Sequence, residues 1–465
     1  MYDLIIVGAG PAGIFAAYEA VRKSPSAKIL ILDKGNDIYN RACPILQGKI
    51  KQCPKGKNGQ QGCEPSCSIT SGFGGAGAYS DGKFNITTEF GGWLGDYMSG
   101  SKLLELINYV DKINLEHGAP QDITDPTTEA VRKIEQEAYG ASMKLLRAQV
   151  RHLGTEINLK VLQSIYEYLK NHVQMEFKQT VTDILIDGKT AIGVISNHKE
   201  YRGKHIVLAP GRDGSAWLAN MLSQHGVPVT CNQVDIGVRA EVSDIVMARL
   251  NKHLYEAKLV FNSSKGMIVR TFCANPSGHV VVENHSGIMA ANGHAYSDPK
   301  LGSANTNFAL LVSHKFDDTF QKPNDYAREI CRRANDLSGG GVIVQRFGDI
   351  MGGRRSTKKR IAEGFVEPTL KEAFPGDLGL VLPYNTMASL VEMTHALDKI
   401  TPGFASEHTL FYGVEAKFYS ARPNLDENFM TAIKGLYCIG DGAGITRGLA
   451  QASAAGVHVS RAIKL

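Results

Sequence analysis

The sequence predicts an α/β fold in which one domain is assembled from segments far apart in the chain. Three observations predict it: a strand, a glycine turn and a helix open the chain, a strand, an acid and a helix close it, and a hairpin followed by a strand lies between them. With 465 residues, of which 43% are hydrophobic and 21% charged, the chain has the composition of a globular protein with two or three domains.

The opening segment, DLIIVGAGPAGIFAAYEAVR, predicts a buried strand over 4–7 and a helix from about Pro11. Its glycines have the G-x-G-x-x-G spacing, in which the first two permit a tight turn and the close approach of a pyrophosphate, and the third lets the helix pack on the strand. The helix N-terminus then faces the phosphates. We therefore expect a dinucleotide pyrophosphate at Gly8, Gly10, Pro11, Ala12 and Gly13.

The next apolar run, KILILDK, ends at an acid with the spacing that this motif requires. Asp33 lies 33 − 13 = 20 residues after the last glycine. A carboxylate at this spacing accepts hydrogen bonds from ribose hydroxyls. We expect Asp33 and the adjacent Lys34 to contact the cofactor, although this motif alone does not separate NAD from FAD.

The closing segment, GLYCIGDGAGITRGLAQASAAGVHVSRAI, predicts a strand over 436–439 and a helix over about 448–463. It resembles the second FAD fingerprint of two-dinucleotide-type flavoproteins. That resemblance implies contacts from Gly440 and Asp441 to the ribityl or pyrophosphate portion, and a helix beginning at Gly448 and Leu449 that points at the flavin pyrimidine. A helix N-terminus stabilises the negative charge of reduced flavin, and Arg447 either adds to this effect or is an ordinary exposed arginine.

The middle segment has Asp187-Gly188 between two strand-like runs, which predicts a hairpin, and then a strand over 206–209. In this superfamily such a hairpin returns the chain to the FAD domain, which implies contacts from Val181, Ala209 and Gly211. We predict a Rossmann-like FAD-binding domain over 1–93, 153–222 and 425–465, a helical insertion over 94–152, and an α+β cap or substrate-binding domain over 223–424. A second G-x-G-x-x-G within a βαβ pattern is absent, so we expect no separate NAD(P)H domain.

Motifs along almost the whole chain resemble one family: GAGPAG, GFGGAGAYSDGK, DIGVRAEV, VRTFCANPSGHVV, YGVEAKFYSARP and GDGAGITRGLAQASAAG. They are similar to the bacterial FAD-dependent dehydrogenases of the NAD(P)/FAD-dependent oxidoreductase family, and distantly to flavoproteins that reduce conjugated steroid double bonds. The resemblance implies that the loop 72–83 lies alongside the isoalloxazine ring.

In that loop, glycines would let the main chain approach the flat ring. We expect backbone contacts from Gly74, Gly75 and Ala76 to N5 and O4 of the flavin. Ser80, Asp81 and Lys83 are catalytic candidates near the reaction face, since Asp81 or Lys83 could move a proton if its surroundings shift its pKa toward neutrality. The alternative for both is a salt bridge that braces the loop.

Substrate-binding candidates are arginines and asparagines of the predicted cap domain. Arginine makes two parallel hydrogen bonds to a carboxylate or phosphate, so an anionic substrate is one hypothesis. The candidates are Arg270, Asn305 and Arg422, with Asn275 and Asn307 in similar surroundings. Glu415 is either part of this group or a partner for one of its cations. The basic run GGRRSTKKR, 352–360, is either a solvated loop or a contact to an anionic substrate or RNA.

Four cysteines, Cys43, Cys53, Cys63 and Cys67, precede the glycine-rich loop. Zinc sites usually contain cysteine pairs two to four residues apart, and only the last two meet this spacing. An iron-sulfur cluster is a second possibility, but we predict no metal and take loop thiols as the default. A Cys-x-x-Cys redox pair is absent, which argues against a disulfide-reductase mechanism.

The leading hypothesis is an FAD-dependent oxidoreductase that passes hydride between flavin N5 and a small, unidentified organic substrate, with NAD(P)H or ferredoxin as the electron source. The alternatives are a flavoprotein hydroxylase and an FAD-containing RNA-binding or tRNA-modifying protein. The small excess of 51 basic over 46 acidic residues does not by itself indicate nucleic acid, and we expect no such partner. Short apolar runs and the start MYDLIIVGAG lead us to expect a cytoplasmic protein without an export signal or membrane span.

Overall fold

The computed structural model describes residues 1–465 except Leu46, 51–53, 55–62, Pro65, Asp81, Tyr255, Ser286, 297–298 and 317–321. The chain divides into two compact units. Unit 1 comprises Met1–Thr124, Ala148–Asn232 and Ser420–Leu465, and unit 2 comprises Asp125–Arg147 and Gln233–Tyr419. Unit 1 therefore includes 223–232 and 420–424, which the sequence placed in the cap domain.

Unit 1 is built on a mixed sheet in the order β6-β2-β1-β9-β8-β7, with β21 paired to β9. Its strands are β1 (Tyr2–Val7), β2 (Ile29–Asp33), β3 (Lys83–Ile86), β5 (Gln149–His152), β6 (Gln174–Phe177), β7 (Val181–Asp187), β8 (Thr190–Ser196), β9 (Lys199–Leu208), β10 (Val229–Thr230), β20 (Arg422–Pro423) and β21 (Leu436–Cys438). Its helices are α1 (Pro11–Lys23), α2 (Gly100–Glu116), α4 (Gly154–Lys170), α5 (Ser215–Gln224) and α11 (Leu449–Ala462), with 3-10 helices η1 (Gly75–Tyr79), η2 (Leu94–Asp96), η3 (Arg212–Gly214) and η6 (Asp441–Ala443).

The central strands β6, β2, β1, β9 and β21 pair in parallel, whereas β7 and β8 extend the sheet as an antiparallel hairpin. The run ILILD of β2 is buried throughout, as expected for a parallel strand covered on both faces. Asp187 pairs with Thr190 across the Asp187-Gly188 step, so the predicted hairpin is confirmed.

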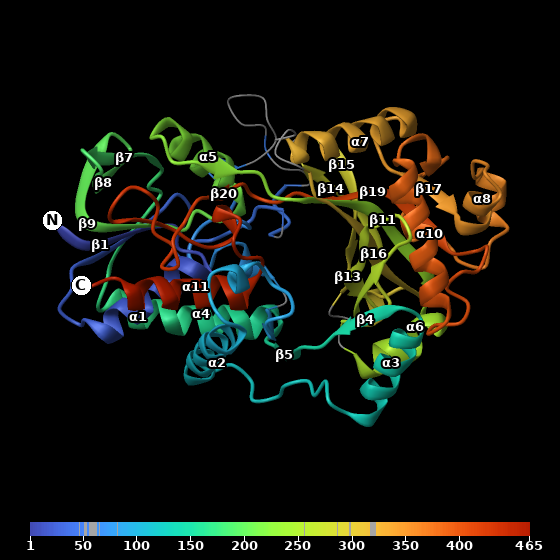
Figure 1. Ribbon diagram of the computed structural model, residues 1–465, viewed down its shortest axis with the longest axis horizontal. Coiled ribbons are helices and arrows are strands. Elements are labelled where there is room, and N and C mark those ends of the chain that lie inside the picture. Colours follow the sequence, from blue (N-terminus) through green and yellow to red (C-terminus); the bar gives the residue numbers. More distant parts are fainter. Residues whose placement is uncertain are drawn as a thin grey trace. The chain divides into compact units, whose positions relative to one another are not determined.

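Helices α1 and α11 lie side by side in unit 1 (Figure 1) although they come from opposite ends of the chain. Small residues allow their close approach, because a Cβ on Gly456 would lie 2.2 Å from the carbonyl oxygen of Ala12. Ser460 donates its hydroxyl to the carbonyl oxygen of Ala16 at 2.5 Å. The small-residue sequence of the closing segment thus serves this helix contact, which brings the two predicted fingerprints together.

The prediction of a helical insertion over 94–152 is wrong in part. Helices α2 and α3 (Glu129–Gly140) form as expected, but 143–146 and 149–152 are the strands β4 (Met143–Leu146) and β5. β4 pairs with a strand of unit 2 and β5 pairs with β3 of unit 1. Pairing with distant strands has overridden the local preference of Leu, Lys and Arg for helix.

Unit 2 is built on a sheet in the order β18-β17-β19-β11-β16-β13-β12-β4. Its remaining strands are β11 (Val234–Ser243), β12 (Lys258–Asn262), β13 (Ile268–Asn275), β14 (His279–His285), β15 (Ile288–His294), β16 (Asn305–His314), β17 (Ile343–Arg346), β18 (Phe374–Pro375) and β19 (Leu410–Lys417). Its other helices are α6 (Asp244–His253), α7 (Pro323–Ser338), α8 (Phe347–Met351), α9 (Lys358–Ala362) and α10 (Tyr384–Asp398), with 3-10 helices η4 (Pro299–Leu301) and η5 (Leu378–Leu380).

The strand β11 shows how the two faces of this sheet differ. Every second residue from Val234 to Val242 is apolar and belongs to a core that includes Met247 of α6 and Leu390 of α10. The intervening positions carry Asp235, Arg239 and Glu241, each with 0% exposure. Since neighbouring residues of a strand point to opposite faces, unit 2 buries charged side chains on the second face of its sheet.

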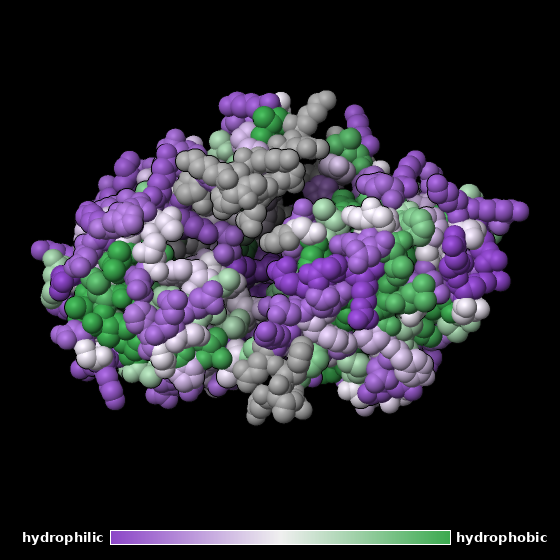
Figure 2. All heavy atoms as spheres, turned by 90° about the horizontal axis from the view of Figure 1, so that it is seen from above, coloured by the Kyte–Doolittle hydropathy of each residue, from purple (hydrophilic) through white to green (hydrophobic). Residues whose placement is uncertain are grey.

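On the face of the molecule that Figure 2 shows, hydrophilic and hydrophobic residues are interspersed. Among the described residues, none of the helices combines the length and the apolar character that crossing a membrane requires.

Candidate functional site

The carboxyl ends of the parallel strands in unit 1 meet at one edge of the sheet, and predicted cofactor residues lie at these ends. β1 leads into Gly8, β2 ends at Asp33, β9 leads into Ala209 and β21 precedes Gly440. The amide of Ala209 donates to the carbonyl oxygen of Val7 at 2.8 Å, which joins two of these ends. Ligands of open α/β sheets bind at this edge.

The three fingerprint glycines have different surroundings. A Cβ on Gly8 would lie 2.2 Å from the carbonyl oxygen of Ala209, and a Cβ on Gly13 would lie 1.9 Å from that of Gly8. A Cβ on Gly10 would have only the Cα of Gly75, at 3.9 Å, within 4 Å among the described residues. Packing within the protein therefore requires glycine at 8 and 13, whereas Gly10 borders space into which a ligand fits.

The helix α1 begins directly after this space. Pro11 is its first residue, and its first turn contains Ala12 and Gly13 but no acidic side chain. N–H groups of a first helical turn lack partners within the helix, and the helix dipole adds positive potential there. The arrangement suits a pyrophosphate at Gly10.

Asp33 and Lys34 at the end of β2 are both held by other residues of unit 1. The carboxylate of Asp33 accepts hydrogen bonds from the amides of Ala9, at 2.8 Å, and Gly35, at 2.7 Å. Because each carboxylate oxygen has two lone pairs, Asp33 retains capacity for ribose hydroxyls. The ammonium of Lys34 lies 2.5 Å from a carboxylate oxygen of Asp213.

Asp441 of the second fingerprint is fixed by two neutral donors. Its carboxylate accepts a hydrogen bond from the hydroxyl of Thr446 at 2.7 Å and from the amide of Gly448 at 3.2 Å. Burial raises the pKa of Asp441, and these two hydrogen bonds oppose the increase. Gly440, directly before it, has φ +80°, which an L-residue rarely adopts.

The helix α11 begins at Leu449, after Gly448, and its N-terminus also borders space. A Cβ on Gly448 would have no described atom within 4 Å, apart from its chain neighbours. The main-chain amide of Arg447 donates to the carbonyl oxygen of Gly91 at 2.7 Å, and that of Trp93 to Ile445 at 2.8 Å. The segment EFGGW, 89–93, thus lines this turn, and no sequence motif indicated it.

The glycine-rich loop packs against both helix N-termini. A Cβ on Gly77 would lie 2.6 Å from Cδ2 of Leu449 and 3.6 Å from Cγ of Pro11. The amide of Gly74 donates to the carbonyl oxygen of Ala9, and the amide of Gly75 to that of Gly72, both at 2.8 Å. These two amides are therefore engaged within the protein, and Ala76 is the exposed residue of the three.

Of the three catalytic candidates in this loop, Ser80 and Lys83 belong to the described residues. The hydroxyl of Ser80 donates to the carbonyl oxygen of Gly77 at 2.7 Å and accepts from the amide of Gly82 at 3.2 Å, so it braces the loop. Lys83 begins β3 and pairs with His152 of β5. Asp81 lies outside the described residues, and its predicted role stays a prediction.

The remaining cofactor candidates lie on the hairpin side of unit 1. Val181 begins β7, is 7% exposed and pairs with Ser196. Gly211 follows β9 with φ +65°, and its carbonyl oxygen would lie 2.4 Å from a Cβ on Gly442. The turn after β9 therefore packs directly on the turn after β21.

These residues fit FAD. Gly10 and Gly448 each border space at a helix N-terminus, where main-chain donors and the helix dipole suit an anion. The carboxylates of Asp33 and Asp441 suit hydroxyl donors such as those of a ribose. One edge of one sheet therefore presents what an elongated dinucleotide requires.

Two of the three substrate candidates are engaged within unit 2. The guanidinium of Arg270 forms an ion pair with Asp235, a carboxylate with 0% side-chain exposure, and contacts the hydroxyl of Tyr419. The amide of Asn305 donates to Glu241 at 3.1 Å and to the carbonyl oxygen of Glu367 at 2.8 Å. Both side chains therefore have structural partners that the sequence did not indicate.

Arg422 belongs to unit 1 and has a different environment. Its Nη2 donates to Asp96 at 2.9 Å and to the hydroxyl of Tyr97 at 3.5 Å. Its guanidinium carbon lies 5.8 Å from the ring centres of both Trp93 and Tyr97. The side chain of Asp96 is 57% exposed, so this ion pair is a weak one.

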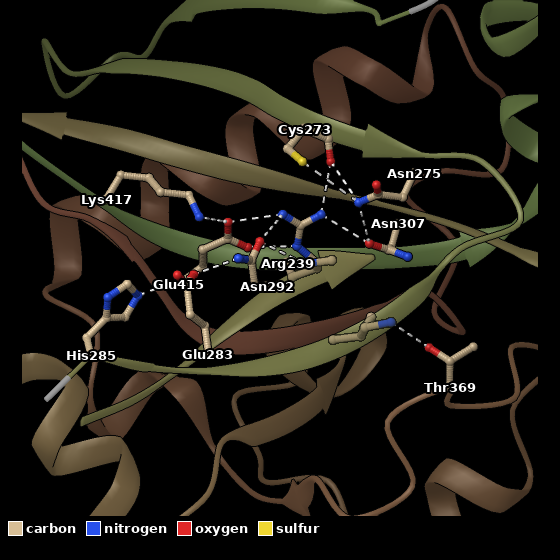
Figure 3. Close-up of polar contacts among 12 residues, drawn as sticks. Arg239, Cys273, Asn275, Glu283, His285, Asn292, Asn307, Thr369, Glu415 and Lys417 are labelled. Atoms are coloured by element: carbon tan, nitrogen blue, oxygen red, sulfur yellow. Dashed lines mark hydrogen bonds and ion pairs between the residues drawn. The ribbon is translucent and has the colours of Figure 1, made fainter. Parts of the chain in front are cut away.

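Figure 3 shows a buried polar network in unit 2 that contains the other candidates of the sequence. Arg239 donates to both carboxylate oxygens of Glu415, at 2.8 and 3.0 Å, and Lys417 lies 2.9 Å from the same carboxylate. Arg239 also donates to the side chain of Asn307 at 3.0 Å, and Asn275 lies beside it. Glu415 is thus a partner for cations, which was the second of the two interpretations of this residue.

The basic run 352–360 is organised by a buried acid. Asp349, with 1% side-chain exposure, accepts from Arg354 at 2.8 Å, from Arg360 at 3.0 Å and from Ser356 at 2.8 Å. Burial alone raises the pKa of Asp349, but these hydrogen bonds and charges prevail and lower it. Part of the run therefore has a structural role.

Cys43 and Cys67 are free thiols, Cys63 is only partly buried, and Cys53 lies outside the described residues. Within the part of the chain that the structure describes, His, Cys, Asp and Glu side chains do not form a group of three or more that could hold a metal ion. The question of a cluster on these four cysteines stays open.

Sequence reasoning missed Arg41, which is 6% exposed. Its guanidinium donates to carbonyl oxygens of the glycine-rich loop and of the segment before it. The only signal was a basic residue shortly after the acid at the end of β2, and no motif includes it.

Two family descriptions match the chain and together cover most of it. Residues 2–235, more than half of the chain, match "Pyridine nucleotide-disulphide oxidoreductase". Residues 236–418 match "FAD-dependent protein, C-terminal domain-like". The predicted distant similarity to flavoproteins that reduce steroid double bonds is not tested by these matches. A comparison with curated proteins found no match.

Solved structures that resemble the chain include three oxidoreductases with low sequence identity. Pyridoxine 4-oxidase from Mesorbium loti is 13% identical, with 99% of each chain covered and a TM-score of 0.43. Glycine oxidase from Geobacillus kaustophilus is 11% identical, with 99% of this chain and 93% of that chain covered and a TM-score of 0.36. A FrdA variant of the E. coli quinol fumarate reductase is 13% identical, with 99% and 69% covered and a TM-score of 0.38.

Proposed function

Because the chain belongs to the pyridine nucleotide-disulphide oxidoreductase family and is an FAD-dependent oxidoreductase, we propose that it passes a hydride between N5 of FAD and a small organic substrate. The observation that supports this proposal is the pair of helix N-termini, at Gly10 and Gly448, which border space at one sheet edge. FAD supplies the hydride chemistry, and the protein supplies position and electrostatics.

Each part of the site has a proposed task. The first turn of α1 binds the pyrophosphate beside Gly10, and Asp33 accepts hydrogen bonds from the ribose. Asp441 accepts a hydrogen bond from the ribityl chain. The N-terminus of α11 would stabilise negative charge on the flavin ring when FAD is bound. Lys83 is the proposed proton donor among the described residues, whereas Ser80 braces the loop through Gly77 and Gly82.

The substrate is proposed to carry a carboxylate that Arg422 binds. The charge of Arg270 is already balanced by the buried Asp235, which favours Arg422 as the residue that binds the carboxylate. Arg422 uses only Nη2 in its described hydrogen bonds, and its acidic partner is largely exposed. The rings of Trp93 and Tyr97 beside it would pack on a flat, unsaturated substrate.

The electron source is proposed to be NADH or NADPH, with ferredoxin as the alternative. The name of the matching family supports a pyridine nucleotide. Cys43, Cys67, Cys273, Cys331 and Cys438 are free thiols, which supports a cytoplasmic location as part of the proposal.

The test is an absorbance spectrum of the purified protein, followed by anaerobic titration with NADH, NADPH and reduced ferredoxin. We expect a flavin spectrum that one of these donors bleaches. A protein that neither contains FAD nor takes it up from solution would contradict the proposal. Rapid oxygen uptake with NADPH would instead indicate the hydroxylase alternative.

Substrate class is tested separately with cinnamate and its neutral amide as probes of the bound flavin spectrum. We expect cinnamate to perturb the spectrum and cinnamamide to bind at least about tenfold more weakly. Arg422→Met removes this preference, whereas the matched change Arg270→Met does not. Equal binding of the two probes to the unaltered protein would contradict a carboxylate-bearing substrate.

A further inference from the structure

Arg41 holds the glycine-rich loop of unit 1 with five hydrogen bonds. Its Nε and Nη2 donate to the carbonyl oxygen of Ser68 at 2.9 and 2.8 Å, and Nη2 also donates to Ile69 at 2.7 Å. Its Nη1 donates to the carbonyl oxygens of Phe73 at 2.7 Å and Gly75 at 2.8 Å. The planar guanidinium thus fixes both ends of the segment 68–75.

The charge of Arg41 lacks the partner that other buried arginines have. Arg151 forms an ion pair with Asp111, and Arg239 forms one with Glu415. Arg41 makes no ion pair with a carboxylate of the described residues, since all of its hydrogen bonds go to main-chain carbonyls. Burial lowers the pKa of Arg41, but a guanidinium stays protonated in proteins. A buried positive charge without an anion is costly, so an anion from outside the chain would stabilise it.

Three nearby groups, Tyr79, Asp33 and Cys67, act on Arg41 through space, and none of them forms an ion pair with it. The carboxylate of Asp33 attracts it through space, but its oxygens are hydrogen-bonded to the amides of Ala9 and Gly35. The guanidinium carbon lies 5.1 Å from the ring centre of Tyr79, whose hydroxyl donates to the carbonyl oxygen of Arg41. Neither contact is an ion pair.

The hydrogen bond from Arg41 to the carbonyl oxygen of Gly75 also affects the amide of the next residue, Ala76. The carbonyl of Gly75 and the amide N–H of Ala76 belong to one peptide group, so a cation at the oxygen polarises the N–H. Ala76 is exposed, and its amide has no hydrogen-bond partner among the described residues. The amides of Gly74 and Gly75 are engaged, so of these three neighbouring residues Ala76 offers an amide donor.

The position of this donor points to the cofactor. Gly75 adjoins Gly10, and Gly77 adjoins both Pro11 and Leu449, the first residues of α1 and α11. The N–H of Ala76 therefore lies on the short turn that packs against both helix N-termini. Both helix ends favour negative charge.

We propose that Arg41 is a positioning residue whose charge, relayed by the Gly75–Ala76 peptide, makes the Ala76 amide a donor to an anionic group of the bound cofactor. This inference rests on the proposed FAD site. The anionic group is either the pyrophosphate or the flavin ring when it carries negative charge. Both groups would present a negatively charged acceptor to the N–H of Ala76, and the experiment distinguishes between them.

The experiment compares Arg41→Gln, which removes the charge, with Arg41→Lys, which keeps the charge but cannot reproduce the planar set of donors of the guanidinium. ADP binding to the apoprotein reports on the pyrophosphate, and sulfite binding to the FAD-loaded protein reports on negative charge in the ring. We expect Arg41→Gln to weaken one of the two affinities by about tenfold to a hundredfold, and Arg41→Lys to lose less. Weaker ADP binding indicates the pyrophosphate, and weaker sulfite binding indicates the ring.

A matched control and a second variant keep the test decisive. Arg461→Gln removes a guanidinium that pairs with Glu19 near the far end of α11, and both affinities should stay unchanged. Ala76→Pro removes the proposed donor N–H and leaves Arg41 in place, so it should reproduce the loss even if Arg41→Gln does not fold.

Two results would overturn the inference. One is that Arg41→Gln and Ala76→Pro both bind ADP and sulfite as the unaltered protein does. The other is that Arg41→Lys loses as much as Arg41→Gln, which would mean that only the geometry of the loop matters. In either result the unaltered protein still binds FAD, whereas failure of the proposed function would show as no FAD binding at all.

Discussion

The sheet edge of unit 1 and the charged face of the sheet in unit 2 both bury polar groups, but they satisfy them differently. In unit 1 the acids and Arg41 bond mainly to the main chain or to a neutral hydroxyl: Asp33 to two amides, Asp441 to Thr446 and Gly448, and Arg41 to carbonyl oxygens. In unit 2 the buried Arg239 and Glu415 satisfy each other as an ion pair (Figure 3), whereas Glu241 accepts hydrogen bonds from Asn305, Thr369 and Tyr412 in packed surroundings.

This difference separates a ligand site from a packed interior. Hydrogen bonds to main-chain groups do not neutralise the charge of a side chain. The sheet edge of unit 1 also has open space at Gly10 and Gly448. Mutual ion pairs neutralise the charges, and close packing fills the space between them: a Cβ on Gly293 would lie 2.3 Å from Arg239, Asn275 and Asn307. Burial of charge alone therefore does not mark a binding site, whereas unneutralised charge beside open space does.

The largest expected effect comes from a matched pair of glycine substitutions in unit 1. Gly10→Val should leave the fold intact, because a Cβ there meets only the Cα of Gly75, at 3.9 Å, among the described residues, but it should abolish detectable FAD binding. Gly13→Ala should lower the free energy of unfolding by about 3 kcal/mol, because its Cβ would lie 1.9 Å from the carbonyl oxygen of Gly8.

Tryptophan fluorescence measures this stability conveniently, since both tryptophans, Trp93 and Trp217, lie in unit 1. Flavin absorbance after incubation with FAD measures binding. If Gly10→Val unfolds as readily as Gly13→Ala, the space beside Gly10 is filled by protein, and the comparison between the two regions fails.

The next effect is expected in unit 2, from Arg239→Met. It leaves Glu415 buried with Lys417 as its remaining cation, so the free energy of unfolding of unit 2 should fall by about 3 kcal/mol. Hydrogen exchange of peptides from 233–419 measures this change. The double variant Arg239→Met/Glu415→Met should recover most of the loss because it removes both charges. A loss of FAD affinity comparable to that of Gly10→Val would show that the network is part of the cofactor site.

A smaller effect is expected from pH. Burial alone raises the pKa of Glu415, but attraction to Arg239 and Lys417 prevails, so its pKa in the folded protein lies below the ordinary 4.5. The unfolded chain then binds more protons than the folded one as the pH falls, so stability that is complete above pH 4.5 decreases on acidification. Exchange of unit 2 peptides at several pH values measures this, and Glu415→Gln should flatten the dependence. If the stability of Glu415→Gln fell more steeply on acidification than that of the unaltered protein, Glu415 would not be the cause of the pH dependence.

The fingerprints could be predicted from the sequence because local spacing determines them. Gly8, Gly10, Gly13 and Asp33 form one strand-turn-helix-strand unit, and the Asp187-Gly188 step selects its own hairpin. The partners of charged side chains could not be predicted, since they are distant in sequence. Arg270 pairs with Asp235, 35 residues away, and Arg41 binds carbonyl oxygens 27 to 34 residues away. The strands β4 and β5 were missed for the same reason.

The smallest expected effect separates the two interpretations of Ser80. Its hydroxyl bonds to Gly77 and Gly82, so Ser80→Ala should lower the free energy of unfolding of unit 1 by about 1 kcal/mol. Because these contacts are structural, the rate of flavin reduction by the electron donor should change less than about threefold. Stopped-flow absorbance of the bound flavin measures that rate, and Ser71→Ala is the matched control, since the Ser71 hydroxyl contacts Asp213 at 3.1 Å. A loss of rate of about a hundredfold or more, with unchanged stability, would instead make Ser80 a catalytic residue.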